Sequence, residues 1–227
     1  MKQPKSSPAT RILFIGNSFT FRNDLPGLLT AMAASGPQPR SVETSMVVAG
    51  GASLRQHWNS GAALESLRQG SWDYVVLQEQ STLPIKNAQR FQESARLLHE
   101  EIEQHGAQTV FYLTWARQAA PESQEALNTA YLTIARELQS LVAPVGIAWQ
   151  SALQEDPKLP LYDTDGSHPS PTGSYVAACV FYATLFNASP VGVPVPATIK
   201  VNAADASLIQ RVAWQTVQAV STARVIA

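Results

Sequence analysis

Short apolar runs alternate with longer segments of helical periodicity along this chain, and this alternation predicts its fold. Most runs have the length of a strand and are rich in β-branched and aromatic residues, which is typical of strands buried on both faces of a parallel sheet. The last run contains Pro144, which cannot donate to a sheet ladder, so we expect that strand at an edge. The predicted strands are residues 11–16, 42–48, 72–78, 109–114 and 142–149.

The segments between the strands carry apolar residues at helical spacing. Pro26, Pro121 and Pro171 lie where helices can begin, and Gly36 lies where one can end. Strands that alternate with helices predict right-handed crossovers, hence a three-layer α/β/α sandwich with a mostly parallel five-stranded sheet. The predicted helices are residues 25–35, 91–105, 122–141, 171–186 and 204–222, with a short helix or loop at 57–70, mostly loop at 150–168 and a proline-rich connection at 187–202.

The composition is that of a globular domain. With 227 residues, of which 45% are hydrophobic and 15% charged, the chain is long enough to bury a sizeable core. We expect one domain over residues 11–227, preceded by a disordered or extended segment at 1–10. The net charge of -1 predicts neither a nucleic-acid partner nor a cationic one. Cys179, the single cysteine, lies in an apolar helical stretch and is expected to be buried and inert.

Nothing in the sequence predicts attachment to a membrane. No segment is apolar over the length of a bilayer, and residues 1–10 lack the apolar core of a signal peptide. We therefore expect a cytoplasmic protein without a membrane partner, or a periplasmic or secreted one if a leader was removed.

Residues suited to catalysis gather at predicted strand ends and in one late loop. Ser18 follows the first strand after Gly16 and Asn17, at the carboxyl edge where open α/β sheets bind ligands. Asp165 and His168 lie three apart in a Gly-Ser turn, so the carboxylate can bind Nδ1 of the imidazole. Nε2 is then left to take a proton from Ser18. The pattern predicts a serine nucleophile, its base and an acid that orients the base.

An acyl-transfer site also needs hydrogen-bond donors for the oxyanion, the negative oxygen of the tetrahedral intermediate. Gly51 follows the second strand in a glycine turn, and its N–H can approach closely because no Cβ is in the way. The N–H of Ser18 is a natural second donor. The side-chain amide of Gln78, at the end of the third strand, is a candidate for a third.

These motifs resemble those of the SGNH (GDSL-type) hydrolases. Gly16-Asn-Ser-Phe-Thr20 is similar to the family's first block, with Asn17 in place of its usual Asp. Gly51 falls where the glycine of the second block belongs, and Asp165-x-x-His168-Pro169 matches the last block. Matching blocks extend from residue 11 to about residue 170. The resemblance implies a flavodoxin-like fold, hydrolysis of carboxylic esters through an acyl-enzyme, an orienting role for Asp165 and no requirement for a metal or other cofactor.

The third block departs from the family pattern, which places an Asn shortly after a glycine behind the strand. Residues 75–81 read Val-Val-Leu-Gln-Glu-Gln-Ser, and a glutamine amide offers the same donor on a longer stem. This block resembles that of the carbohydrate acetylesterase branches. We favour Gln78 over Gln80 as the donor because it lies where the strand should end. Candidates for substrate binding are Asn17, Gln80, Trp115 and Arg117.

Each of the site residues also has a purely structural interpretation. Ser18 could cap a helix, Gly51 could serve only its turn, and Gln78 could bond the backbone. Trp115 could stack on a sugar ring or simply pack, and Arg117 could pair with Glu79 or Asp163.

Two further questions concern the acid and the remaining histidines. Asp163 is an alternative orienter for the base, but in an extended segment its two-residue register with Asp165 would point it elsewhere. His57, His99 and His105 are expected on helix surfaces, although His57 could face the cleft.

Three functions compete on this pattern. The first is a serine esterase that removes small acyl groups such as acetyl from a carbohydrate or a similar small molecule. The second is a non-catalytic carbohydrate-binding protein on the same fold, which the departure at residues 78–80 keeps open. The third is a metal-dependent hydrolase with Asp163, Asp165 and His168 as ligands, for which the sequence offers no further cluster to complete a metal shell.

Overall fold

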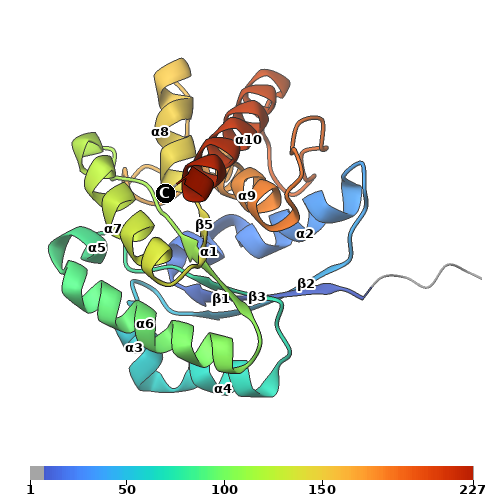
Figure 1. Cartoon of the computed structure of the whole chain (residues 1–227). Helices are drawn as coiled ribbons and strands as arrows, with labels where there is room; N and C mark the ends of the chain where they lie inside the picture. The colour runs from blue at the N-terminus through green and yellow to red at the C-terminus, as the bar shows by residue number, and fades with distance from the viewer. Residues whose placement is uncertain (1–7, 227) are drawn as a thin grey trace, which may run out of the picture.

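One five-stranded sheet lies between two layers of helices in the computed structural model, which describes residues 8–226 (Figure 1). All neighbouring strands are parallel, in the order β2-β1-β3-β4-β5, which is the flavodoxin-like order. This confirms the predicted three-layer sandwich and the edge position of the fifth strand. The strands are β1 (Thr10–Gly16), β2 (Val42–Val48), β3 (Tyr74–Leu77), β4 (Gln108–Tyr112) and β5 (Leu141–Ala143).

The helices cover both faces of the sheet (Figure 1). Helices α2, α8, α9 and α10 pack on one face, and α3, α4, α6 and α7 pack on the other. The helical elements are α1 (Ser18–Phe21), η1 (Arg22–Asp24), α2 (Leu25–Ser35), α3 (Leu54–Ser60), α4 (Ala62–Gln69), α5 (Leu83–Lys86), α6 (Ala88–Gln104), η2 (Pro121–Ser123), α7 (Gln124–Glu137), α8 (Val145–Glu155), α9 (Pro171–Phe186) and α10 (Ala203–Ile226). None of the described helices is both long enough and apolar enough to cross a bilayer.

The apolar run of β1 is continuous because both of its faces are covered. Ile12 and Phe14 face the α9 side of the sheet, whereas Leu13 and Ile15 face the α6 side, and none of the four is exposed. Successive side chains of a strand point to opposite faces, so a strand covered by two layers has no polar position to offer.

The prediction that residues 142–149 form a strand is wrong beyond Ala143. Pro144 ends β5 and precedes α8, which occupies Val145–Glu155 and also replaces part of the loop expected at 150–168. Val145, Ala148, Trp149 and Ala152 are buried at helical spacing. A short apolar run is compatible with a buried strand and with a buried helix, so periodicity alone could not distinguish the two here.

Smaller differences occur at other boundaries. The segment predicted as a short helix or loop at 57–70 is two helices, α3 and α4, joined at Gly61 with a positive φ of 76°. Helix α7 ends at Glu137 rather than 141, and Leu141 begins β5. The segment expected to be disordered or extended, 1–10, contains the first residue of β1, and residues 1–7 lie outside the described part of the chain.

Candidate active site

Ser18 stands where β1 ends and the short helix α1 begins. Asn17 caps α1 in an extended conformation, with its Oδ1 accepting from the Phe19 N–H at 3.1 Å. Its Nδ2 donates to the Ala52 carbonyl at 2.9 Å, which ties this turn to the loop after β2. As the first residue of α1, Ser18 has an N–H without an intrahelical acceptor, and none of the residues described accepts from it. That N–H is free for a ligand beside the Ser18 hydroxyl.

The turn before Ser18 requires a glycine because the side chains of Thr20 and of Gln78, the residue after β3, fill the space beside it. A Cβ on Gly16 would lie 2.6 Å from Oγ1 of Thr20 and 2.7 Å from Oε1 of Gln78. The same Gln78 oxygen accepts from the Asn17 N–H at 2.8 Å and from the Thr20 hydroxyl at 3.0 Å. Gln78 therefore fixes the backbone that delivers Ser18.

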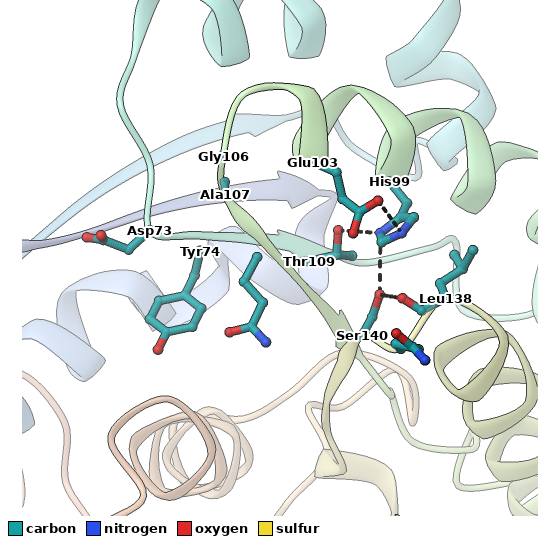
Figure 2. Close-up of a pocket in the computed structure, with 11 residues that line it drawn as sticks. Asp73, Tyr74, His99, Glu103, Gly106, Ala107, Thr109, Leu138 and Ser140 are labelled. Atoms are coloured by element: carbon teal, nitrogen blue, oxygen red, sulfur yellow. Dashed lines mark hydrogen bonds and ion pairs between the residues drawn. The ribbon is translucent and has the colours of Figure 1, made fainter.

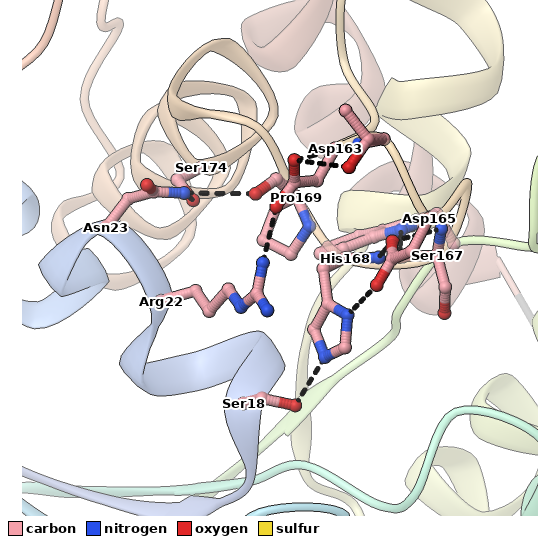
Figure 3. A network of polar contacts seen from close by, with 11 residues as sticks. Ser18, Arg22, Asn23, Asp163, Asp165, Ser167, His168, Pro169 and Ser174 are labelled. Atoms are coloured by element: carbon pink, nitrogen blue, oxygen red, sulfur yellow. Dashed lines mark hydrogen bonds and ion pairs between the residues drawn. The ribbon is translucent and has the colours of Figure 1, made fainter.

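The structure brings together the three residues predicted as nucleophile, base and orienting acid (Figure 3). The Ser18 hydroxyl donates to Nε2 of His168 at 2.8 Å, and Nδ1 of His168 donates to Oδ2 of Asp165. The second carboxylate oxygen accepts from the N–H groups of Ser167 and His168, each at 2.9 Å. These hydrogen bonds, the imidazole first, hold the pKa of Asp165 well below its usual value. The imidazole is thus fixed in the tautomer that can accept the serine proton.

A second set of contacts joins the segment after Ser18 to the loop that carries His168 (Figure 3). Arg22 forms an ion pair with Asp163, and the Asp163 N–H donates to the His168 carbonyl at 2.8 Å. Nδ2 of Asn23 donates to the Pro169 carbonyl at 3.1 Å and to the Ser174 hydroxyl at 2.9 Å. Asp163 therefore points away from the imidazole, but it does so in a turn closed by the Gly166 N–H on the Asp163 carbonyl, and not in the extended segment that the register assumed.

The ion pair considered for Arg117, with Glu79 or Asp163, does not form among the described residues. Arg117 is exposed, and within residues 8–226 it forms no ion pair with either carboxylate, since Asp163 pairs with Arg22. Asp163, one of the three ligands considered for a metal, is held by Arg22. No group of three or more His, Cys, Asp or Glu side chains in the described part of the chain is arranged to hold a metal ion.

Gly51 lies in an exposed turn with a φ of 66°, where a side chain would be strained. Its N–H has no acceptor among the described residues. The loop around it is anchored on both sides, because Ala49 N–H donates to the Gly16 carbonyl at 3.3 Å and Asn17 holds the Ala52 carbonyl. The loop therefore presents a free N–H on a fixed backbone.

The two glutamines of the third block have different surroundings. Gln78 has no exposed surface, and its Nε2 donates to the Glu79 carbonyl at 2.6 Å. Gln80 is partly exposed, and its Oε1 accepts from the N–H and hydroxyl of Thr82 and from the Leu83 N–H. No described residue accepts from Nε2 of Gln80. The amide nitrogen that remains available for a ligand is thus that of Gln80, not that of the favoured Gln78.

Trp115 packs and cannot stack on a sugar. Its ring lies between Phe19 at 4.6 Å and Trp149 at 4.1 Å, nearly parallel to both, and only 1% of the residue is exposed. Its Nε1 donates to the Ser167 carbonyl at 3.0 Å. Trp115 therefore supports Phe19 and Ser167, which are the chain neighbours of Ser18 and His168.

The expectation of three surface histidines holds only for His105. His57 is buried, with Nε2 donating to the Gly16 carbonyl at 2.7 Å, and burial lowers its pKa. His57 lies one helical turn after the buried Leu54, and that spacing was the signal in the sequence. His99 is mostly buried and hydrogen bonds to the hydroxyl of Thr109 at 3.0 Å.

His99 lines a hollow at the other edge of the sheet (Figure 2). This hollow has a volume of about 430 Å³ and is bordered by Tyr74, Thr109 and Ser140, which lie at the starts of β3, β4 and β5. Ser18 and Gln78 lie at the carboxyl ends of β1 and β3. The hollow is therefore separate from the cluster around Ser18.

Comparison with solved structures places the chain among proteins of one fold. It resembles a protein from Slackia heliotrinireducens assigned to the SGNH hydrolases, with 29% identity and a TM-score of 0.69, covering 78% of this chain and all of the other. A DUF4886 family protein from Bacteroides uniformis gives a TM-score of 0.73 at 19% identity, covering 93% and 95% of the two chains. An acetylxylan esterase from Geobacillus stearothermophilus gives 0.62 at 15% identity, covering 78% and 95%. No family model and no curated protein matches the sequence.

Proposed function

The chain belongs to the SGNH hydrolase family, and we propose that it is a serine esterase that cleaves carboxylic esters through an acyl-enzyme. The observation that carries this proposal is the chain of hydrogen bonds from the Ser18 hydroxyl through the imidazole of His168 to Asp165. A hydroxyl donating to an imidazole whose other nitrogen is held by a carboxylate is the arrangement that activates a serine.

In the proposed reaction Oγ of Ser18 attacks the ester carbonyl while its proton passes to Nε2 of His168. The tetrahedral intermediate collapses, the C–O bond to the alcohol breaks, and the imidazolium returns the proton to the leaving alcohol. Water then attacks the acyl-enzyme with His168 again as base, which releases the carboxylic acid and restores the Ser18 hydroxyl. Asp165 stays ionised throughout, since its hydrogen bonds favour the carboxylate.

The proposed donors for the oxyanion are the N–H groups of Ser18 and Gly51 together with one glutamine amide. The burial of Gln78 and its bond to the Glu79 carbonyl favour Gln80 as that third donor. We therefore propose Gln80 in place of Gln78 as the third donor. Gln78 positions the backbone at Asn17. Loss of a single such donor lowers kcat about a hundredfold or more.

The proposed substrate is a small-molecule or carbohydrate ester with a small acyl group such as acetyl. Support comes from the acetylxylan esterase fold that the chain resembles. Turnover of a panel of p-nitrophenyl esters of increasing acyl length, and of acetylated xylo-oligosaccharides, tests both parts of the ester.

A fluorophosphonate probe tests the mechanism. We expect covalent labelling at Ser18, its loss in Ser18→Ala, and much slower labelling in His168→Ala, because the probe needs an activated serine. Ser207→Ala, on the exposed face of α10, is the matched control and should label like the wild-type protein. Well-folded protein that resists the probe, or Ser18→Ala that still labels, contradicts the proposal, and the first result would favour a non-catalytic binding protein.

A further inference from the structure

Glu79 is a buried carboxylate next to Gln80, which carries one of the proposed oxyanion donors. It follows Gln78 after the end of β3, and only 1% of the residue is exposed. A carboxylate at such a depth loses its hydration, which must be offset by hydrogen bonds. Burial accordingly raises the pKa of Glu79 to about 7, while the N–H groups that it accepts from act in the opposite direction.

One oxygen of Glu79 connects two separate segments of the site. Its Oε1 accepts from the Leu54 N–H at 3.1 Å and from the Gln80 N–H at 2.6 Å. Leu54 begins α3 at the end of the loop that carries Gly51, and Gln80 carries the proposed third donor. The carboxylate is therefore the shared acceptor of the two segments that present oxyanion donors.

The Gly51 loop is otherwise tied to β1, not to the third block. Its contacts through Ala49 and Ala52 lead to Gly16 and Asn17. The contact from Leu54 to Glu79 sets the loop relative to the segment after β3. The distance between the two donors depends on this contact, and oxyanion donors act only when both lie near hydrogen-bond distance of the same oxygen.

We propose that Glu79 is a positioning residue that holds the Gly51 loop and Gln80 in register, so that their donors converge on one oxyanion. This inference rests on the proposed esterase function. The second carboxylate oxygen, Oε2, is buried and has no partner among the described residues, so the contact to the two N–H groups uses Oε1 alone. A glutamine at position 79 can keep that acceptor, whereas an apolar residue cannot.

The test compares three substitutions of Glu79 in the full chain, with p-nitrophenyl acetate as substrate and fluorophosphonate labelling to count active sites. Glu79→Gln keeps an acceptor oxygen and should retain kcat per labelled site within about threefold of wild type. Glu79→Leu leaves both N–H groups without an acceptor, and should lower kcat about ten- to a hundredfold with KM changed less than about twofold. Glu79→Asp shortens the stem and should lower kcat by a factor between those of the other two variants. It takes the place of Glu79→Leu in the comparison if the leucine variant does not fold.

Gln210→Leu is the matched control. Gln210 is a buried side chain on α10. It accepts from the Gly192 N–H and donates to the Val193 carbonyl, and it contacts none of the site residues through these bonds. It should unfold more easily than wild type but keep kcat per labelled site.

The positioning role is supported if Glu79→Leu or Glu79→Asp loses kcat while Glu79→Gln keeps it. Equal kcat in all three Glu79 variants, an equal loss in all three, or a loss confined to KM overturns it. Failure of the esterase proposal is a distinct result, because the wild-type protein would then neither label nor turn over any ester.

Discussion

Oγ of Ser18 lies 2.8 Å from Nε2 of His168, although 150 residues separate them in the chain. The serine is delivered by the first strand and the imidazole by the loop that precedes α9. The contact therefore exists only when the sheet and its last crossovers have formed, so catalysis reports on folding of the whole chain rather than of one half.

Asp165→Asn should lower kcat about a thousandfold to ten-thousandfold with little loss of stability. An amide can present N–H to Nδ1 of His168, which favours the wrong tautomer for accepting the Ser18 proton. Steady-state turnover of p-nitrophenyl acetate measures the effect. Asp163→Asn, in the same loop but bound to Arg22, is the control and should lose far less. Equal losses in the two variants would mean that Asp165 does not orient the base.

The stability of the protein should fall as the pH rises from about 4.5 to above 7 because of Glu79. Its pKa is raised from 4.5 to about 7 by burial, so the folded protein binds this proton more tightly than the unfolded chain. The stabilisation is complete below pH 4.5 and is lost as the pH rises through 7, a change of up to about 3 kcal/mol.

Urea unfolding at a series of pH values, compared between wild type and Glu79→Gln, measures this contribution. Across this pH range the unfolding free energy of the wild type should fall relative to that of Glu79→Gln. A difference that does not vary with pH would show that Glu79 titrates normally in the folded protein.

Gly16→Ala should destabilise the protein by about 1–3 kcal/mol and also lower kcat. The new methyl group would push on Oγ1 of Thr20 and Oε1 of Gln78, and both side chains are fully buried and cannot swing aside. Thermal unfolding and ester turnover measure the two effects. Gly50→Ala, whose Cβ would meet no atom within 4 Å, should keep the unfolding free energy of wild type within about 0.5 kcal/mol.

The ion pair of Arg22 with Asp163 should affect kcat more than it affects the free energy of unfolding. Both side chains are about two-fifths exposed, at 38% and 41%, so their pair should contribute less than about 1 kcal/mol to the free energy of unfolding. The pair nevertheless joins the segment after Ser18 to the loop of His168.

A double-mutant cycle with Arg22→Ala and Asp163→Ala measures both couplings. We expect the two single variants to lower kcat by similar factors and the double variant to lower it no further, because either change releases the same contact. Losses of kcat that multiply in the double variant would show that the two residues act separately.

The parallel sheet and the contact between Asp165 and His168 could be predicted because their causes are local. Residues 12–15 of β1 are all apolar and buried, and the Asp165–His168 contact spans a single turn. The differences from expectation concern residues whose surroundings depend on individual side-chain contacts, which spacing in the sequence does not show. The amide nitrogen of Gln78 is buried and donates to the Glu79 carbonyl, and the environment of His57 is set by the Gly16 carbonyl. Trp115 follows a strand as pocket residues often do, yet Phe19 and Trp149 cover both faces of its ring.

The placement of Asp165 and His168 in one turn bears on how the enzyme would fail. Because both groups belong to the same short loop, an opening of that loop withdraws them together, and no partly equipped site with a misoriented base is left behind. Substitutions of Asn23 or Arg22, which contact this loop from η1, should therefore reduce the fraction of molecules that are competent at any instant, and leave the speed of each competent molecule unchanged. If the loop opens and closes more slowly than Ser18 is acylated, such damage lowers the burst amplitude in a pre-steady-state experiment, whereas faster opening lowers the burst rate.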